Sequence, residues 1–350
     1  MSEDPIRLGL VGCGYWGPKV ARAAASLPEV TLAALVDRDE QLARRLQGLY
    51  PTAQVATSLG DVLDSVDAVI VATNPATHTE VAGEAIAAGK HALVEKPLAL
   101  SSADCRSLGR QAEAAGVVLM AGHTFLFSPA VQLIHGMITS GELGEIYYVD
   151  SQRLNLGKVR QDVDAIWNFA PHDVSITNYW MGGAPGTVAC HAYEYLQEGI
   201  ADVATMNLEY GAVAALIQIS WLSPSKVRHM TVVGSEKMVV YDDVAGTVLV
   251  HDAGIDRERV DRSFADFDSF EEFRLIHRLG DVHMPRLPAT EPLVAQCRHF
   301  AECIRTGARP VAGAQEAIEV VGVLEAATTS HNAGGTRVQL PERPQPALAQ

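Results

Sequence analysis

A glycine motif near the amino terminus constrains the fold of this chain more than any other feature. A β-rich run, residues 6–11, is followed at once by three glycines and then by a helical pattern. Gly12 permits a tight turn, Gly14 lets the backbone approach a pyrophosphate, and Gly17 allows close helix–strand packing. The helix N-terminus then offers free N–H groups to phosphates. The residues predicted to contact a dinucleotide in this loop are Gly12, Gly14, Tyr15, Trp16 and Gly17.

The second predicted strand, residues 30–36, ends in a carboxylate that bears on the choice of cofactor. Asp37 lies about 20 residues after Gly17, where a carboxylate binds the ribose 2′-hydroxyl of NAD. It would repel the 2′-phosphate of NADP, so NAD is favoured. The neighbouring Arg38 could still accommodate that phosphate, so NADP is kept as the alternative. Asp37 could instead be the N-cap of a helix predicted at residues 40–47.

Strand and helix patterns go on alternating as far as residue 121, which predicts a parallel, doubly wound sheet. Such sheets bind ligands at the carboxyl ends of their strands. Thr73, Asn74 and His78 follow one of these strands and are candidate cofactor contacts, although turn chemistry explains Thr73 and Asn74 equally well. Further strands are predicted at residues 54–56, 66–72, 91–95 and 117–121, and further helices at residues 76–88 and 101–115.

The apolar run at residues 91–94 ends abruptly in Glu95, Lys96 and Pro97. A run of this length is typical of a buried parallel strand. Lys96 would then lie at the edge of the sheet where ligands bind. A lysine taken at random is more often solvated, but the cofactor pattern before it favours a functional Lys96. We therefore predict Glu95 and Lys96 at the cofactor, and Lys96 also at the substrate.

After residue 122 the pattern changes, because β-rich runs follow one another with few helices between them. This predicts a second domain, residues 123–340, with an open, mainly antiparallel sheet and helices on one face. Residues 1–122 form the predicted Rossmann domain, and the Pro-rich residues 341–350 a disordered tail. The second domain is predicted to contain strands at 146–153, 187–195, 203–209, 212–220, 227–233 and 237–242, and helices at 129–140, 170–180, 291–305 and 314–330.

Charge and cysteine content narrow the possible partners. A formal net charge of −15 argues against nucleic-acid binding by bulk electrostatics. The five cysteines and the histidines lack metal-ligand spacing, so we predict no metal site and buried thiols in a reducing cytoplasm. No apolar run reaches the length of a membrane span, and the amino terminus has no signal-peptide pattern. We expect a cytoplasmic protein that acts on a small molecule.

His172 is the main candidate for proton transfer in the second half. It lies in the helix predicted among the strands, and histidine exchanges protons near neutral pH. A lone histidine is nevertheless more often structural. Asn168 precedes it by four residues and would share its face if the segment is helical, with Trp167 beside it. His123, where the pattern changes, is a weaker candidate substrate contact that packing explains as well.

The segment from Arg153 to Arg160 is locally basic in an acidic protein, and it includes Asn155 and Lys158. Guanidinium groups suit a phosphate or a carboxylate on a substrate. A solvated strand end explains the same residues equally well. We keep Arg153, Asn155 and Arg160 as candidate substrate contacts.

These motifs together resemble the glucose–fructose oxidoreductase / inositol dehydrogenase (Gfo/Idh/MocA) family. The matching segments are residues 12–17, 88–97 and 168–172, and the likeness extends from Ile6 to about Leu340. The resemblance implies a Rossmann domain, an α+β domain, and homodimers or homotetramers formed through the sheet of that second domain. It also implies reversible hydride transfer between a sugar-type hydroxyl carbon and nicotinamide.

The resemblance implies roles for two residues. Lys96 would hydrogen-bond the reacting oxygen, with its peptide bond to Pro97 often cis, and His172 would exchange the hydroxyl proton. A cation stabilises a developing alkoxide, and a neutral imidazole accepts a proton. The family often has an aspartate where this chain has Asn168, and an amide cannot titrate. Either His172 works without a carboxylate partner, or another residue is the base, or catalysis has weakened.

The surroundings of Asn168 and His172 resemble family members that act on nucleotide sugars, commonly at the C3 hydroxyl. An NAD-dependent nucleotide-sugar dehydrogenase is therefore the leading hypothesis. One alternative is a dehydrogenase of free sugars or inositol. An alternative of another class is an NAD(H)-binding sensor that has lost turnover, and Asn168 is its motivation.

Overall fold

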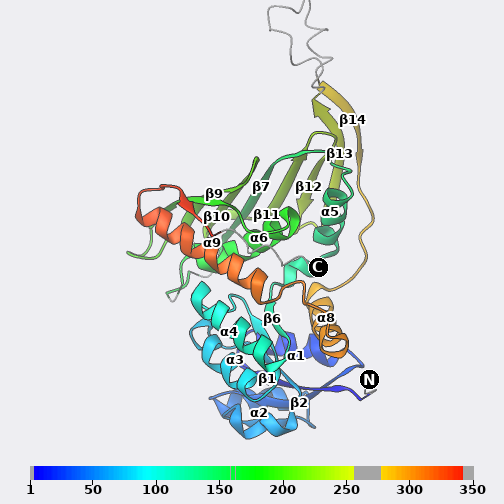
Figure 1. Cartoon of the computed structure of the whole chain (residues 1–350), viewed down its shortest axis with the longest axis vertical. Helices are drawn as coiled ribbons and strands as arrows, with labels where there is room; N and C mark the ends of the chain where they lie inside the picture. Colours follow the sequence, from blue (N-terminus) through cyan, green and yellow to red (C-terminus); the bar gives the residue numbers. More distant parts are fainter. Residues whose placement is uncertain (1–3, 158, 162, 256–276, 342–350) are drawn as a thin grey trace, which may run out of the picture. The chain divides into compact units, whose positions relative to one another are not determined.

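The chain divides into two compact units (Figure 1). A computed structural model describes residues 4–157, 159–161, 163–255 and 277–341. The first unit comprises Met1–Ser128 and Thr290–Glu325, and the second comprises Pro129–Ala289 and Ala326–Gln350. The chain first passes from the first unit to the second after residue 128, near the domain boundary predicted at residue 122. Helix α8 (Pro292–Thr306) groups with the first unit, whereas the prediction assigned it to the second domain.

The first unit is organised around a six-stranded parallel sheet of order β3-β2-β1-β4-β5-β6. The chain reverses its direction across the sheet between β1 and β4, and ligands bind at such switch points. Every strand and helix predicted before residue 122 is present within a few residues. The strands are β1 (Ile6–Val11), β2 (Val30–Val36), β3 (Gln54–Ala56), β4 (Ala68–Val71), β5 (His91–Glu95) and β6 (Leu119–Gly122), and the helices α1 (Gly17–Ala25), α2 (Glu40–Gln47), α3 (His78–Ala87) and α4 (Ser102–Ala115).

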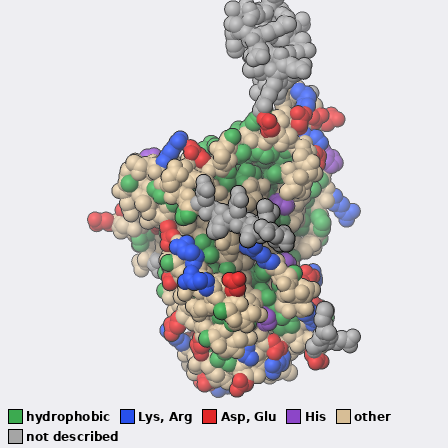
Figure 2. All heavy atoms as spheres, viewed as in Figure 1, with side chains coloured by type: hydrophobic (Ala, Val, Ile, Leu, Met, Phe, Trp, Pro, Cys, Tyr) green, Lys and Arg blue, Asp and Glu red, His purple; other side chains and the backbone are tan. Residues whose placement is uncertain are grey.

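The core of the first unit explains why its strands could be recognised. All four residues of β4 are buried, as are the three middle residues of β5, which is the pattern of strands covered on both faces. The five cysteines of the chain are free and buried, as predicted. Acidic and basic side chains are interspersed on the visible surface of this unit (Figure 2).

The second unit is built on a nine-stranded sheet of order β14-β13-β12-β11-β7-β10-β9-β8-β15. Within this sheet, β7–β10 is the only parallel pair among the described strands, so the predicted mainly antiparallel sheet is confirmed. Strands β13, β14 and β15 were not predicted from the sequence patterns. The strands are β7 (Ile146–Leu156), β8 (Thr187–Tyr193), β9 (Val203–Tyr210), β10 (Val213–Ser220), β11 (Leu222–Gly234), β12 (Met238–Asp242), β13 (Thr247–Ile255), β14 (His277–His283) and β15 (Val338–Gln339).

Helix α6 (Ala165–Met181) packs on β7, β9 and β10, and α5 (Pro129–Thr139) packs on α6 (Figure 1). Helix α9 (Ala314–Asn332) has residues in both units. The predicted tail, residues 342–350, lies outside the described residues. None of the helices in the described part of the chain has the length and hydrophobicity that a bilayer crossing requires.

Helix α6 begins five residues earlier than the predicted start at Ala170. Asp164 is its N-cap and accepts a hydrogen bond from the backbone N–H of Trp167 at 2.8 Å. A helix that began at Ala170 would have Pro171 in its first turn, where proline is favoured. Pro171 instead lies inside the helix. Trp167 and Asn168 are therefore helical, which places Asn168 one turn before His172 on the same face.

Candidate functional site

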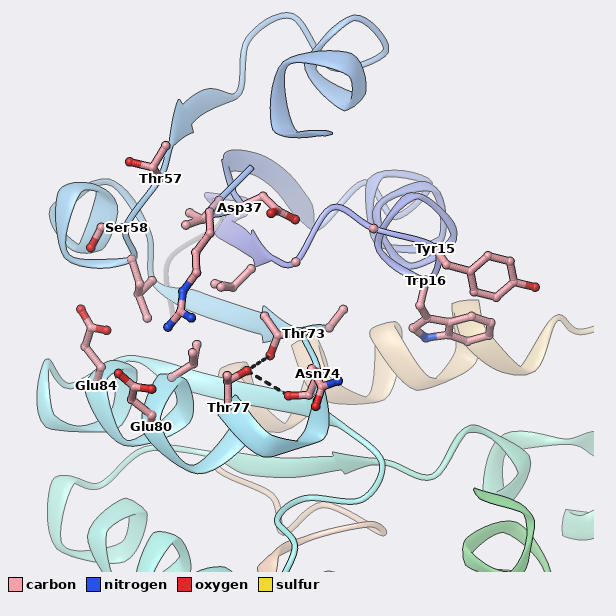
Figure 3. A pocket seen from close by; sticks show the side chains of 18 residues that line it. Tyr15, Trp16, Asp37, Thr57, Ser58, Thr73, Asn74, Thr77, Glu80 and Glu84 are labelled. Carbon is pink, nitrogen blue, oxygen red and sulfur yellow. Dashed lines mark hydrogen bonds between the residues drawn. The ribbon is translucent and has the colours of Figure 1, made fainter. Parts of the chain in front are cut away.

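A pocket of about 710 Å³ lies at the carboxyl ends of β1, β2 and β4 in the first unit (Figure 3). This volume lies in the range of ligand-binding pockets. The structure brings together most of the predicted cofactor residues there, although they come from three separate loops. The predicted residues that line it are Gly12, Gly14, Tyr15, Trp16, Asp37, Arg38, Thr73 and Asn74.

The glycine loop has the geometry that its spacing predicts. Gly12 has a φ of 99°, and a Cβ there would lie 2.6 Å from the carbonyl oxygen of Ala72. A Cβ on Gly17 would collide with the carbonyl oxygen of Gly12, so the helix start can approach the strand only as glycine. A Cβ on Gly14 would meet no described atom within 4 Å. Gly14 thus leaves its side of the loop open to a ligand, and a dinucleotide fits this loop.

Asp37 is held by the glycine loop itself. Its Oδ2 accepts a hydrogen bond from the backbone N–H of Cys13 at 2.7 Å, and its Oδ1 accepts one from Asp39 at 2.9 Å. The N-cap of α2 is Asp39, whose side chain accepts from the N–H of Gln41. The alternative that Asp37 caps this helix is therefore wrong. The carboxylate of Asp37 lines the pocket, as the ribose-binding hypothesis requires.

Two further carboxylates line the pocket and were missed from the sequence. Glu80 and Glu84 lie one turn apart on α3 and point to the pocket from the side opposite Asp37 (Figure 3). Their spacing of four residues on a predicted helix was the available signal. Thr57 and Ser58, after β3, complete this end. The other lining residues that were not predicted to contact a cofactor are Val11, Val36, Leu59, Ala72, Thr77 and Val81.

Thr73 and Asn74 serve both the turn and the pocket. The Asn74 side chain accepts a hydrogen bond from the backbone N–H of Ala76 at 3.0 Å and so caps the short 3₁₀ helix Pro75–Thr77. The Thr77 hydroxyl donates to Thr73 Oγ1 at 2.8 Å or to the Asn74 carbonyl at 2.9 Å. The turn interpretation is therefore confirmed, and because both residues also line the pocket, their contact with the cofactor stays a prediction.

The predicted segment Glu95–Pro97 lies at the carboxyl end of β5, and the peptide bond between Lys96 and Pro97 is cis, as the resemblance implied. Glu95 accepts a hydrogen bond from Trp16 Nε1 at 2.6 Å through its Oε1. Its Oε2 accepts from the backbone N–H of Lys96 at 3.3 Å. Burial raises the pKa of Glu95, and the Trp16 hydrogen bond opposes that rise.

His78 was predicted to contact the cofactor, and the structure assigns it another position. Its ring is only 1% exposed and is absent from the pocket lining. Nδ1 lies 2.8 Å from the carbonyl oxygen of Pro97, and Nε2 lies 3.3 Å from that of Thr73. His78 therefore supports the pocket wall from behind, because both ring nitrogens face main-chain oxygens.

His123 follows β6 and is 2% exposed. Neither ring nitrogen has a hydrogen-bond partner among the described residues. Burial, together with the charge of Lys96, lowers the pKa of His123 to about 4. The imidazole is therefore neutral at pH 7, and its burial favours the packing interpretation over a substrate contact.

The candidates in the second unit are carried by α6. Trp167, Asn168 and His172 are all partly buried on this helix. Trp167 Nε1 donates a hydrogen bond to the Thr328 hydroxyl at 3.2 Å. Asn168 and His172 share a face, as predicted, and their roles stay predictions.

Arg153 is held by a buried ion pair that the sequence did not indicate. Its Nε lies 2.6 Å from Asp173 Oδ2, and Ser151 donates a hydrogen bond to Asp173 Oδ1 at 2.8 Å. Burial lowers the pKa of Arg153, but the charge of Asp173 and its hydrogen bonds outweigh burial and raise the pKa overall. These contacts favour a structural role for Arg153 over the predicted substrate contact. They attach α6 to β7 at the residue next to His172.

The other candidates of the basic segment are more exposed than Arg153. Asn155 and Arg160 are partly exposed, and the Arg160 carbonyl accepts a hydrogen bond from Gln197 at 3.1 Å. Lys158 lies outside the described residues. The described residues include no group of three or more His, Cys, Asp or Glu side chains that could hold a metal ion.

Family models match both parts of the chain. The model described as "Oxidoreductase family, NAD-binding Rossmann fold" (GFO_IDH_MocA) matches residues 6–123. The model described as "GFO/IDH/MocA C-terminal domain" matches residues 131–240. These two matches cover more than half of the chain.

Individual proteins are similar over longer stretches. The 4-carboxy-2-hydroxymuconate-6-semialdehyde dehydrogenase of Sphingobium sp. is 31% identical over 60% of this chain and 71% of its own length. The UDP-N-acetylglucosamine 3-dehydrogenase of Acidithiobacillus ferrooxidans is 28% identical over 78% of this chain and 90% of its own. The crystal structure of GenD2 from gentamicin A biosynthesis, in complex with NAD, is 25% identical with a TM-score of 0.78 and covers 97% of each chain.

Proposed function

The chain belongs to the Gfo/Idh/MocA family of NAD-binding oxidoreductases, and from this premise we propose that it is an NAD-dependent dehydrogenase of a nucleotide sugar, acting at the C3 hydroxyl. The observation that carries the proposal is the pocket that unites the glycine loop with the Asp37 carboxylate. The 28% identity to a UDP-N-acetylglucosamine 3-dehydrogenase, over 90% of that enzyme, supports the substrate class.

The residues of the pocket fit NAD better than NADP. Asp37, Glu80 and Glu84 line it, and three carboxylates oppose a 2′-phosphate that Arg38 alone would attract. Gly14 leaves room for the pyrophosphate beside the start of α1. When bound, NAD supplies the acceptor or donor of the hydride. The chain must then stabilise the substrate oxygen and exchange one proton.

We assign these two tasks to Lys96 and His172. The Lys96 ammonium would hydrogen-bond the substrate oxygen and stabilise negative charge that develops on it during oxidation. His172 would accept the hydroxyl proton as a neutral imidazole and return it in the reverse direction. Asn168 would hydrogen-bond a neighbouring hydroxyl, because its amide both donates and accepts but carries no charge.

The proposal also includes assembly into a homodimer or homotetramer through the sheet of the second unit. Several strands of this sheet carry exposed hydrophobic side chains. Among them, Tyr148 on β7 is 40% exposed and Leu216 on the neighbouring β10 is 43% exposed. Light scattering after size-exclusion chromatography would measure the mass of the particle. A monomeric mass at micromolar concentration would contradict this part of the proposal.

Absorbance of NADH at 340 nm tests the function directly. The purified protein is mixed with NAD and, in parallel, with UDP-N-acetylglucosamine, dTDP-glucose, free N-acetylglucosamine and myo-inositol. We expect turnover with at least one nucleotide sugar. Turnover with free sugars or inositol alone would favour the alternative dehydrogenase, and tight NADH binding without any turnover would favour the sensor.

A further inference from the structure

The turn from Glu95 to Pro97 is held by side-chain contacts to both of its end residues, inside the first unit. On one side, His78 Nδ1 lies 2.8 Å from the carbonyl oxygen of Pro97. On the other side, Trp16 Nε1 donates to Glu95 Oε1 at 2.6 Å. Lys96 lies between these two anchored residues. Both contacts are short.

On the His78 side, the two ring nitrogens face two carbonyl oxygens. A neutral imidazole has only one N–H, so it can donate to one of them at a time. Burial lowers the pKa of His78, so the ring carries a single proton at neutral pH. The contact to Pro97 is shorter, at 2.8 Å, than the contact to Thr73, at 3.3 Å. We therefore assign the proton to Nδ1, which donates to Pro97.

On the Trp16 side, the carboxylate of Glu95 is confined by its surroundings. A Cβ added at Gly122 would lie 2.9 Å from Glu95 Oε2 and 3.0 Å from Glu95 Cα, so a larger residue on β6 would displace this carboxylate. The same oxygen accepts from the backbone N–H of Lys96 at 3.3 Å. The Glu95 carboxylate therefore links the indole of Trp16 to the main chain of Lys96.

Both anchors are linked to the walls of the cofactor pocket. Trp16 lines that pocket, and so does Thr73, whose carbonyl oxygen faces the second nitrogen of His78. We propose that Trp16 and His78 are positioning residues that clamp the turn at residues 95–97 and thereby set the orientation of Lys96 from both walls of the cofactor pocket. The proposal rests on the catalytic role proposed above for Lys96.

Variants of His78 separate hydrogen bonding from packing. In His78→Asn the side-chain amide nitrogen takes the place of Nδ1 and can still donate to Pro97. In His78→Gln the amide reaches the place of Nε2 instead, and His78→Leu has no donor. We expect the kcat for UDP-N-acetylglucosamine to fall about 10- to 100-fold in His78→Leu and His78→Gln, because small displacements of a catalytic group have effects of this size. His78→Asn should lose several-fold less.

Trp16→Phe removes the indole N–H and keeps an aromatic ring. We expect about a 10-fold fall in kcat, with KM for the sugar changed by less than about 3-fold, because positioning acts mainly on the transition state. A merely structural role would lower the melting temperature without this split between kcat and KM.

His91→Leu is the matched control for the His78 variants. His91 lies at the opposite, amino end of β5, where its Nδ1 accepts a hydrogen bond from the backbone N–H of Val118 at 2.9 Å. Loss of this hydrogen bond should lower the melting temperature and leave kcat within about 2-fold of wild type, because a hydrogen bond far from the site contributes to stability and not to catalysis.

Hydrogen–deuterium exchange decides the proposal without any substrate. With saturating NADH, the amides of residues 98–100 should exchange faster in His78→Leu and Trp16→Phe than in wild type and in His91→Leu. Wild-type exchange in both variants would overturn the clamp, and equal kcat values for His78→Asn and His78→Gln would overturn the Nδ1 assignment. Full activity of Lys96→Ala would instead overturn the catalytic role proposed for Lys96, and absence of turnover with every sugar would overturn the proposed function. The exchange measurement needs no substrate, so it tests the clamp separately from both.

Discussion

The two units hold their functional candidates by different means. In the first unit, the pocket is formed by short loops at strand ends, and main-chain groups do much of the positioning. The Asp37 carboxylate, for example, is oriented by the backbone N–H of Cys13. In the second unit, His172 lies on a long helix that is fastened to the sheet by the buried Arg153–Asp173 ion pair.

This difference teaches where each site is vulnerable. Main-chain hydrogen bonds survive most side-chain substitutions, so the cofactor pocket should tolerate changes around it. Removing either partner of a buried ion pair strongly destabilises the fold, because the remaining charge is buried without a counter-charge and without water to solvate it. Binding in the cofactor pocket of the first unit therefore depends on main-chain geometry and single functional groups, whereas the position of His172 in the second unit depends on a buried ion pair between two side chains.

The largest expected effect tests the first unit. Lys96→Ala should lower kcat by about 1,000-fold or more, because it removes the cation proposed to stabilise the substrate oxygen. NADH affinity, measured by fluorescence titration, should change by less than about 3-fold. Lys90→Ala, on the turn before β5, is the control and should keep wild-type turnover. Unchanged turnover in Lys96→Ala would remove this residue from the mechanism.

The corresponding test in the second unit is Asp173→Ala. It leaves the Arg153 guanidinium buried without its carboxylate, and we expect the free energy of unfolding to fall by about 3–5 kcal/mol. Chemical denaturation monitored by circular dichroism measures this. Replacing both partners, with Arg153→Met and Asp173→Leu, should recover much of the loss.

The exposed pair of Arg44 and Glu40 is the control for that experiment. Glu40→Gln should change the free energy of unfolding by less than about 0.5 kcal/mol, because solvent screens such pairs. If Asp173→Ala costs no more than Glu40→Gln, the two units do not differ in the way argued above.

Buried His123 provides a prediction about pH. Its pKa is about 4 in the folded protein, below the ordinary 6.5, so the unfolded chain binds more protons between these values. The stability that the neutral ring permits is therefore complete above pH 6.5 and is lost as the pH falls toward 4, by about 3 kcal/mol in total. His123→Phe should flatten this part of the stability–pH curve more than His135→Phe on α5 does, because burial lowers the pKa of both rings but the His135 ring is less buried. An unchanged curve in His123→Phe would contradict the assignment.

The same contrast explains what the sequence could predict. Each strand of the first unit is a short apolar run next to its own turn signal, so local patterns sufficed for the whole sheet and for the pocket at residues 12–17, 37 and 73–74. The N-cap at Asp164 was missed because Pro171 resembles a first-turn proline. Strand β14 contains His277, Arg278 and Asp281, and it is a strand because it pairs with β13.

Contacts between side chains that lie far apart in the sequence could not be predicted from the sequence. Arg153 and Asp173 are separated by 20 residues, and Trp16 and Glu95 by 79. Arginine near a predicted strand end is compatible with solvent, a substrate or an ion pair, and only the fold decides among them. His78 illustrates the same limit, since its sequence position beside the pocket did not reveal that its ring points to main-chain oxygens behind it.

A smaller effect is expected from the cofactor carboxylate. Asp37→Ala should weaken NAD binding by about 10- to 150-fold, because one charge-assisted hydrogen bond to the ribose contributes about 1.5–3 kcal/mol. NADP binding should weaken less or improve, since the mutation removes a repulsive charge. Isothermal titration calorimetry with both cofactors measures the ratio. Equal losses for the two cofactors would contradict the ribose assignment, and Asp39→Ala, which removes only the N-cap of α2, is the control.

The smallest effect is expected at residue 168, where this chain has asparagine and the family often has aspartate. Because Asn168 lies one turn before His172 on α6, Asn168→Asp would place a carboxylate on the same helical face and raise the pKa of His172. Oxidation needs the neutral imidazole, so the acidic limb of the kcat–pH profile should move to higher pH, by about 1 unit at most. Asn168→Ala should lower the rate without moving that limb, since it adds no charge. If both variants keep the wild-type profile, His172 is not the titrating base, and the second unit would then contribute substrate binding rather than proton transfer.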